Sequence, residues 1–336
     1  MHVAEVREEE SSVSTPSRTG SAPRRPMLAG LAVVLVVVVV AAAFTALRLR
    51  STSGSAGPTA VTPTLSVPPA QRLSWAPPTL TDPITITVSA DNRDLRLQPD
   101  RDYRIVLPTS PLTLTGGLTI AGGHNVVLIG GEIVVPSASD APEPRQRRGL
   151  LLHGQYGTVH VEGLRISGDD LSEGIDLDEL DSTTVQLENI AVGTVHGTRS
   201  GNHADVVQSW AGPSRLRIDG LTGSTTYQGL FLLPNQFLDV APTSFDLRRI
   251  VLTSDTNNPE GKAGYLLWTA DSAPWMHASD ITLVDPRHDL ASFLRPVDVW
   301  APSVTVQASA KGAPLPQGTP GAGYATPGYA ETTGSP

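Results

Sequence analysis

The segment GNHADVVQSW brings three polar side chains and one aromatic side chain together around two valines. A strand that only closed a core would not need the four other side chains so close together. A loop would not need the valines. The carboxylate of Asp205, the amide of Gln208 and the imidazole of His203 can form directed hydrogen bonds with hydroxyl groups. The indole of Trp210 can stack on the apolar face of a sugar ring. The segment therefore indicates a strand that closes a core on one side and carries a ligand-binding face on the other.

Short apolar runs like this one recur along the chain in two interleaved series. The first series is centred on Gly131, Gly163, Asn189, Gly220, Arg249 and Asp280. The second series covers residues 149–153, 174–178, 206–210, 229–233 and 264–268. Two series with the same irregular period indicate a chain that winds repeatedly and stacks like strand on like strand. The pattern predicts an all-β fold, a single-stranded parallel β-helix. An antiparallel β-sandwich is the alternative.

The second series predicts which side chains face outward, because alternate residues of a strand point to opposite sides. The inward pairs are Leu150/Leu152, Ile175/Leu177, Val207/Ser209, Leu230/Leu232 and Tyr265/Leu267. The outward pairs are Leu151/His153, Asp176/Asp178, Gln208/Trp210, Phe231/Leu233 and Leu266/Trp268. Adjacent coils lie about 4.8 Å apart. We therefore expect a groove with acids, amides and aromatic rings along one strand face.

A corner next to this face explains why Asp205 does not follow the alternation. Four of the five runs have glycine where this run has Val206, which indicates a bend or bulge that resets the side-chain direction. Asp205 then stands in a column with Arg148, Glu173, Gln228 and Ala263. His203, Tyr227 and Lys262 come from the adjoining loops.

The candidate catalytic residues are Asp205, His203, Asp176 and Glu173. The candidate substrate-binding residues are Gln208, Trp210, Gln228, Phe231, Trp268, Asp178, Tyr227 and Lys262. Paired carboxyls could hydrolyse a glycosidic bond, whereas His203 or Lys262 could act as the base of a lyase. Ca²⁺ is a possible cofactor, held by oxygen ligands of Asp176, Asp178 and Glu173, although no metal site is assigned. A polar column at a corner can also simply satisfy backbone groups.

The segments NVVLIGGEIVV (125–135), TVQLENIAV (184–192) and LRIDGLT (216–222) resemble the strand–bend–strand units of the pectin-lyase-like superfamily. The resemblance implies a right-handed parallel β-helix. It does not imply an activity, because this fold hosts lyases, hydrolases, epimerases and non-enzymatic surface proteins. The catalytic patterns of polygalacturonases and pectate lyases are absent or fragmentary, so no catalytic role is carried over. The strand HADVVQ is similar to a His-x-Asp-Gly-Ile-Gln type of strand found in the superfamily.

The organisation of the chain predicts a membrane-anchored protein. We expect a disordered cytoplasmic tail (1–26), a transmembrane signal anchor (27–47), a Ser/Thr/Pro-rich linker (48–83), the β-helix (84–311) and a disordered Gly/Pro-rich tail (312–336). The uncharged run 27–47 is long enough to span a bilayer, and a cleaved signal peptide is the alternative. The folded domain is then extracytoplasmic, in a bacterial envelope. Arginines flank the run on both sides, so their count does not decide the orientation.

The composition of the chain excludes some classes of function. The chain has 336 residues, a net charge of −9 and no cysteine. The acidic balance argues against nucleic acid as a partner, and the lack of cysteine excludes disulfides and thiolate sites. We expect a protein that binds or processes a polysaccharide along the groove. The alternative is a non-catalytic surface or structural module.

Overall fold

The computed structural model describes residues 71–307, except 138–146, 170, 256, 259, 261–262, 286 and 288, and also residues 324–325. The predicted cytoplasmic tail and transmembrane helix lie outside the described residues. So do residues 48–70 of the linker, Lys262, and the C-terminal tail apart from 324–325. Within the described part of the chain, no helix has the length and apolar character needed to cross a membrane.

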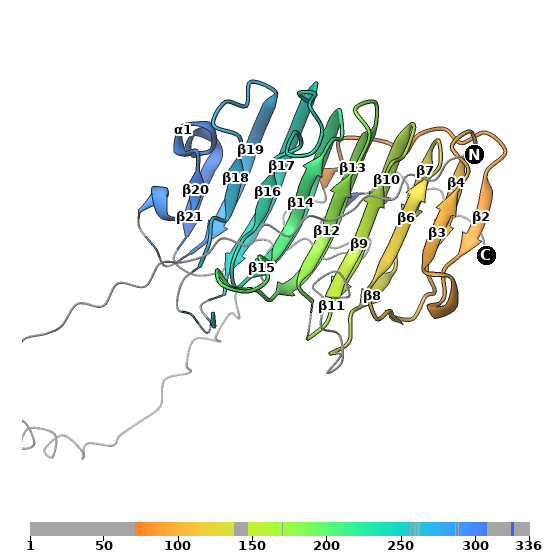
Figure 1. The fold of residues 1–336 in the computed structure, drawn as a ribbon, viewed down its shortest axis with the longest axis horizontal. Coiled ribbons are helices and arrows are strands. Elements are labelled where there is room, and N and C mark those ends of the chain that lie inside the picture. The colour runs from red at the N-terminus through yellow and green to blue at the C-terminus, as the bar shows by residue number, and fades with distance from the viewer. Residues whose placement is uncertain are drawn as a thin grey trace, which may run out of the picture. The chain divides into compact units, whose positions relative to one another are not determined.

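The described chain forms a parallel β-solenoid built from two sheets (Figure 1). We call the 12-stranded sheet the long sheet and the 8-stranded sheet the short sheet. Each coil runs from a strand of the short sheet into a strand of the long sheet, and every named strand pair is parallel. The parallel β-helix predicted from the two series is thus confirmed, and the antiparallel sandwich is excluded.

The bounds of the elements follow the two series. The path of the long sheet is β2 (Ile84–Thr87), β4 (Tyr103–Val106), β7 (Val126–Ile129), β10 (Thr158–Glu162), β13 (Thr184–Val195), β15 (Arg215–Thr225), β17 (Ser244–Ser254), β19 (Met276–Val284) and β21 (Val304–Gln307). Its remaining strands are β5 (Leu112–Thr113), β8 (Glu132–Val134) and β11 (Arg165–Ser167). The short sheet contains β3 (Asp94–Leu97), β6 (Leu118–Gly122), β9 (Arg148–His153), β12 (Glu173–Asp178), β14 (Asp205–Ala211), β16 (Leu230–Leu232), β18 (Leu267–Thr269) and β20 (Leu294–Arg295).

A few short elements complete the described chain. They are a two-stranded sheet of β1 (Gln71–Arg72) and β22 (Tyr324–Ala325), the single-turn helix α1 (Val297–Trp300) and the 3₁₀ turns Ala90–Asn92, Leu290–Ser292 and Ala301–Ser303. Near the last coil, Phe293 and Trp300 are fully buried. The Trp300 indole donates a hydrogen bond to the Arg295 carbonyl, at 3.1 Å, so its one polar atom is satisfied.

The core lies between the two sheets, because each strand turns alternate apolar side chains inward. Leu150, Ile175, Val207, Leu230 and Leu267 occupy equivalent positions in successive coils of the short sheet. All five are fully buried. The facing column of the long sheet is equally apolar and includes Val161, Leu187, Ile218 and Leu247. Burying aliphatic side chains of this kind contributes roughly 1.5–3 kcal/mol each.

The centres of the first series are bends inside the long sheet, and all six have a positive φ. The values are 96° for Gly131, 65° for Gly163, 51° for Asn189, 77° for Gly220, 50° for Arg249 and 53° for Asp280. The strand–bend–strand units predicted from the sequence are therefore present. Only glycine adopts this conformation without steric cost, although Asn and Asp tolerate it better than most residues.

The inward register of the second series is as predicted for four coils and wrong for the last. Among the outward positions, Trp210 was expected beside Asp178, but the register shifts and Ala211 is the partner of Asp178. Tyr265 was expected beside Leu230, but Leu267 is the partner of Leu230 and Trp268 is the partner of Phe231. The corner of this coil is Leu266, which is buried in the core and not outward-facing as expected. Leu266 is the structural equivalent of Val206, so the corner residue of this coil is also apolar. Gly264 lies two residues before the corner. Ala263 consequently does not belong to the corner column, where Tyr265 stands instead.

The N-terminal segment 73–76 packs on the outer face of the long sheet. The Trp75 amide donates to Glu188 Oε1 at 2.8 Å, and the Ser74 amide donates to Asp219 Oδ2 at 2.8 Å. The guanidinium groups of Arg217 and Arg248 lie 5.6 and 4.9 Å from the centre of the Trp75 ring. Figure 1 shows the segment, in orange, crossing from the middle of the solenoid to β2. Residues assigned to a linker from composition therefore belong in part to the folded unit.

The strained bend at Asp280 gives a test of the fold. Asp280 is exposed and has a φ of 53°. We expect Asp280→Val to lower the free energy of unfolding by about 1–2 kcal/mol, because a β-branched residue is poorly accommodated at positive φ. Asp280→Gly is expected to leave it unchanged or slightly higher. Urea denaturation measures both changes.

The matched control is Thr282→Val, two residues further along β19 and without positive φ. It places the same side chain in ordinary strand backbone, so we expect a change within about 0.5 kcal/mol. Equal losses at both positions would show that the bend at residue 280 does not constrain the side chain.

Candidate functional site

A bulge at the start of β14 directs Asp205 and Gln208 to the same side of the short sheet. The amides of Val206 and Val207 both donate to the Gly229 carbonyl, at 2.8 and 3.2 Å. Both valines are buried in the core. With two successive residues inward, the residues on either side of them face outward. The corner predicted from the glycine positions is therefore present.

Close backbone contact explains the glycines at this corner. A Cβ atom on Gly174 would lie 2.3 Å from the Val206 carbonyl oxygen, and a Cβ on Gly229 would lie 2.3 Å from the Leu266 carbonyl oxygen. A side chain at either position would push adjacent coils apart. Glycine at these corners thus keeps the outward column in register.

A cluster of three carboxyl groups and one guanidinium lies at the corner. Glu173 is the register partner of both Arg148 and Asp205, and Asp176 forms an ion pair with Arg148. Glu173 Oε1 accepts a hydrogen bond from Asn202 Nδ2 at 3.2 Å, and its Oε2 accepts one from the Asp205 amide at 3.2 Å. We call these four residues, Arg148, Glu173, Asp176 and Asp205, the carboxyl cluster.

The carboxyl cluster is buried, although it faces away from the core. Glu173, Asp176 and Asp205 are all nearly or fully inaccessible to solvent, as is Gln228. Neither carboxyl oxygen of Asp205 has a hydrogen-bond partner among the described residues. These side chains lie close together, as predicted. They are buried, however, whereas the sequence predicted that they would line an open groove.

Burial controls the protonation of the cluster. Loss of hydration raises the pKa of Asp205 well above its ordinary value, and the nearby carboxyls of Glu173 and Asp176 raise it further. Burial, reinforced by Asp176, also raises the pKa of Glu173. Burial raises the pKa of Asp176 to about 6, against the opposing effect of Arg148. A buried group favours its neutral form, so the cluster holds protons that exposed carboxyls would release.

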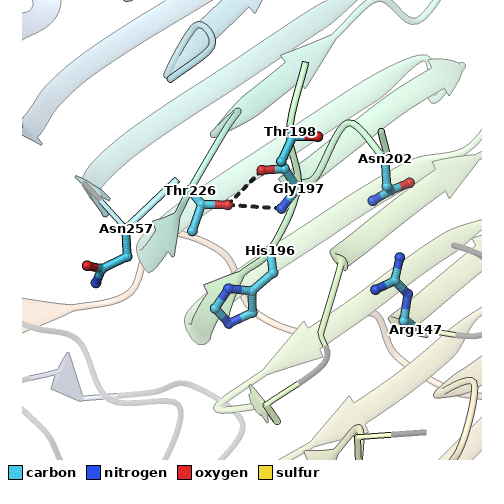
Figure 2. A pocket seen from close by; sticks show the side chains of 7 residues that line it. All are labelled: Arg147, His196, Gly197, Thr198, Asn202, Thr226 and Asn257. Atoms are coloured by element: carbon cyan, nitrogen blue, oxygen red, sulfur yellow. Dashed lines mark hydrogen bonds between the residues drawn. The ribbon is translucent and has the colours of Figure 1, made fainter. Parts of the chain in front are cut away.

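Loop 196–204 and Tyr227 lie next to the cluster, since Asn202 donates to Glu173 and the charge of Asp205 acts on Tyr227. The His203 and Tyr227 rings lie 5.1 Å apart. Tyr227 is nearly buried, and that burial raises its pKa, whereas His203 is exposed. A cavity of about 380 Å³ opens beside this loop (Figure 2). It is lined by Arg147, His196, Gly197, Thr198, Asn202, Thr226 and Asn257. Asn202 thus joins the cavity wall to Glu173.

An aromatic column lies beside the cluster on the outer face of the short sheet. Gln208, Phe231, Trp268 and Arg295 are register partners in four successive coils. Phe231 and Trp268 pack edge to face at 4.9 Å, and the Arg295 guanidinium lies 4.8 Å from the centre of the Trp268 ring. The first three side chains are half-buried and Arg295 is exposed. We call these four residues the aromatic column.

Two further aromatic rings flank the column. Trp210 is the extra residue of a second irregularity in β14, where the register shifts. The Arg148 guanidinium lies 5.7 Å from its ring centre. Tyr265 packs against Trp268 at 5.4 Å. Both rings are half-buried, so the face offers several partly accessible aromatic surfaces next to polar groups.

No protein family, curated protein or solved structure matches this chain.

Of the remaining predicted site residues, Asp178 lies apart from the carboxyl cluster, and Lys262 lies outside the described residues. The distance between Asp178 Oδ2 and Nδ1 of the exposed His153 is 2.9 Å, at the end of strands β9 and β12 of the short sheet. Arg295 is not among the predicted site residues, because the second series ends at residue 268. The short run Phe293-Leu294-Arg295 repeats the apolar–outward alternation once more, and it would have extended the column by one coil.

Asp176, Asp178 and Glu173, considered from the sequence as Ca²⁺ ligands, do not bring three ligand atoms close enough together to hold a metal ion. Asp176 is neutralised by Arg148, and Asp178 lies at the end of β12. Among the described residues, one group of His and acidic side chains has ligand atoms close enough to hold a metal ion. It is His160, Glu162 and Glu188, on the other sheet.

The raised pKa of Asp205 predicts a pH-dependent stability. The folded protein keeps a proton that the unfolded chain releases above a pKa of about 3.9. The free energy of unfolding therefore falls as the pH rises from that value toward the folded pKa, by up to about 1.4 kcal/mol per pH unit. Asp205→Asn carries no such proton. We expect this variant to gain stability relative to the wild type between pH 5 and pH 8, measured by urea denaturation at both values.

Asp181→Asn is the control, since Asp181 is exposed in the turn after β12. Its stability relative to the wild type should change little between the two pH values. A gain for Asp205→Asn that is no larger at pH 8 than at pH 5 would show that Asp205 is ionised in the folded protein.

Proposed function

We propose that the protein binds a polysaccharide along the outer face of the short sheet. The observation that carries the proposal is the aromatic column, in which Gln208, Phe231, Trp268 and Arg295 follow one another at the spacing of the coils. One coil spacing, about 4.8 Å, is close to the length of one sugar unit. A glycan lying along the solenoid would thus meet a new side chain with each residue.

The chemistry of the face suits hydroxyl-rich ligands. Aromatic rings provide apolar contact for the C–H faces of sugars. Gln208 both donates and accepts hydrogen bonds, and Arg295 offers a planar set of donors. Half-buried aromatic side chains that are already packed lose little conformational freedom when a ligand binds.

Binding without bond cleavage is favoured over catalysis. A general acid or nucleophile has to reach within hydrogen-bonding distance of the scissile bond. Glu173, Asp176 and Asp205 are covered, and Asp176 is already paired with Arg148. In this proposal the carboxyl cluster supports the shape of the face, and the protein is a binding module.

The cellular setting belongs to the same proposal. The apolar run 27–47 anchors the chain in the membrane, and the solenoid lies on the extracytoplasmic side of a bacterial envelope. The coils are right-handed, as in the pectin-lyase-like superfamily. The linker then holds the binding face away from the lipid.

The test is affinity for a panel of neutral and acidic polysaccharides, measured by isothermal titration with the full-length chain. We expect Trp268→Ala to lower the affinity for the bound glycan at least tenfold, because it removes a ring at the centre of the face. Tyr156→Ala is the control, since Tyr156 is exposed on the turn between β9 and β10 and lies outside the column. It should change affinity less than twofold.

Two outcomes would contradict the binding proposal. The first is an equal effect of Trp268→Ala and Tyr156→Ala in variants of unchanged melting temperature. The second is the appearance of new chain ends on a polysaccharide incubated with the wild type, lost in Asp205→Asn. That second result would make the protein an enzyme with Asp205 at its centre.

A further inference from the structure

A second cluster of ionisable side chains lies on the outer face of the long sheet, away from the carboxyl cluster. His160 and Glu162 are two residues apart on β10, so both point to the same side. Glu188 is the register partner of Glu162 in β13. One imidazole nitrogen and two carboxylate oxygens from these residues all lie within 4.8 Å of one another. All three side chains are fully buried.

One oxygen in this cluster has no partner. Glu188 Oε1 accepts the Trp75 amide, but Glu188 Oε2 has no hydrogen-bond partner among the described residues. An unpartnered buried carboxyl oxygen is costly. The parallel register places a second carboxyl, that of Glu162, directly beside it. Two buried carboxyls in register repel each other when both are charged, and a proton or a metal ion between them relieves that repulsion.

The neighbouring arginines bind other groups, although the charge of Arg249 also acts on Glu188 and opposes the rise in its pKa. Arg249 forms a two-pronged ion pair with Asp219, with a 2.6 Å contact from Nε. Arg217 and Arg248 stack on the Trp75 ring. These three arginines therefore bind Asp219 and the N-terminal segment, and Arg249 is also close enough to Glu188 to favour its charged form.

We infer that His160, Glu162 and Glu188 form a binding site for a divalent first-row transition metal ion, for which Zn²⁺ is the probe. One imidazole and two carboxylates balance the charge of such an ion, and they match its preference for nitrogen and oxygen ligands. Bonds of about 2.0–2.2 Å in a tetrahedral site bring ligand atoms to within about 3.4 Å of one another. The ligand atoms lie within 4.8 Å of one another, so metal binding requires them to move closer together by at most about 1.4 Å.

The Gln186 amide distinguishes the metal-bound state from the proton-bound state. Gln186 is the register partner of His160, and its side chain lies 2.7 Å from His160 Nδ1. With its nitrogen toward His160, Gln186 donates to Nδ1 and also contacts the Ala76 carbonyl and Arg217. His160 Nε2 then carries the proton and donates it to Glu162 at 2.9 Å. With its oxygen toward His160, Gln186 accepts the Nδ1 proton and leaves Nε2 free for the metal ion.

The position of the cluster gives the ion a structural role. It would join β10 to β13 and fix the carboxylate that receives the Trp75 amide. The ion would thus hold the N-terminal segment against the long sheet. Because the Trp75 amide binds Glu188, binding of the ion would precede or accompany the docking of this segment.

The experiment uses the full-length chain, freed of metal with a chelator and then given Zn²⁺. Zinc is counted by mass spectrometry after gel filtration, and affinity is measured by competition with a zinc indicator. We expect one Zn²⁺ per chain and a rise in melting temperature on adding Zn²⁺, because the ion binds the folded state. His160→Gln and Glu188→Gln should each lose the bound ion. Gln186→Glu should bind at least tenfold more tightly, since a carboxylate fixes the Nδ1–H tautomer.

Two controls separate this site from adventitious binding. Glu179→Gln removes a buried carboxyl at the end of β12, and His153→Gln removes an exposed imidazole. Both should keep one Zn²⁺. If the two cluster variants do not fold, zinc-edge X-ray absorption of the wild type decides, with one imidazole and oxygen ligands expected. Folded wild type that retains no Zn²⁺, or a His160→Gln protein that retains it, would overturn the inference and leave a proton between the carboxyls.

Discussion

Each coil of the solenoid has to place its residues directly beside the equivalent residues of the next coil. This register is what the rest of the structure depends on. For apolar side chains it is favourable, since Leu150, Ile175 and Val207 stack into one continuous core. For charged side chains it is costly, because like groups of successive coils come within one strand spacing of each other. The polar chemistry of the protein is therefore organised around like-charged neighbours.

The two sheets reduce the repulsion between like-charged side chains in different ways. On the short sheet, Arg148 neutralises Asp176, and burial keeps protons on Glu173 and Asp205. On the long sheet, a histidine and a tightly packed segment surround Glu162 and Glu188. In both places the acids face away from the core and are nevertheless covered. The accessible chemistry is left to the aromatic column, which carries no carboxyl group.

The sequence predicts the fold well, because the bends and corners recur. Asn189, Arg249 and Asp280 stand where other coils have glycine, and the repeat locates them as bends despite their different side chains. The last corner was misplaced, since Gly264 resembles the other corner glycines while Leu266 forms the corner. Glycine is required at a corner only where the backbone of the adjacent coil comes too close for a Cβ atom. At other corners an apolar residue can occupy the equivalent position.

The cover of the site could not be read from periodicity. Asp205 and Glu173 were correctly expected together at the corner. Their neighbours Asn202 and Tyr227 belong to loops without a repeat. The contact of Trp75 with Glu188 joins residues 113 positions apart in sequence. Nothing in a Ser/Thr/Pro-rich composition distinguishes the part of a linker that docks from the part that does not.

The route of the N-terminal segment determines how the solenoid bears mechanical load. The chain contacts β13 and β15 through Ser74 and Trp75, and only at Ile84 does it enter β2, the terminal strand of the long sheet. Tension applied at residue 71 therefore reaches the middle of the sheet first. The contacts of Trp75 have to break before any force pulls on β2. The terminal coil, which has a neighbour on one side only and would unravel most easily, is thereby shielded from tension on the chain.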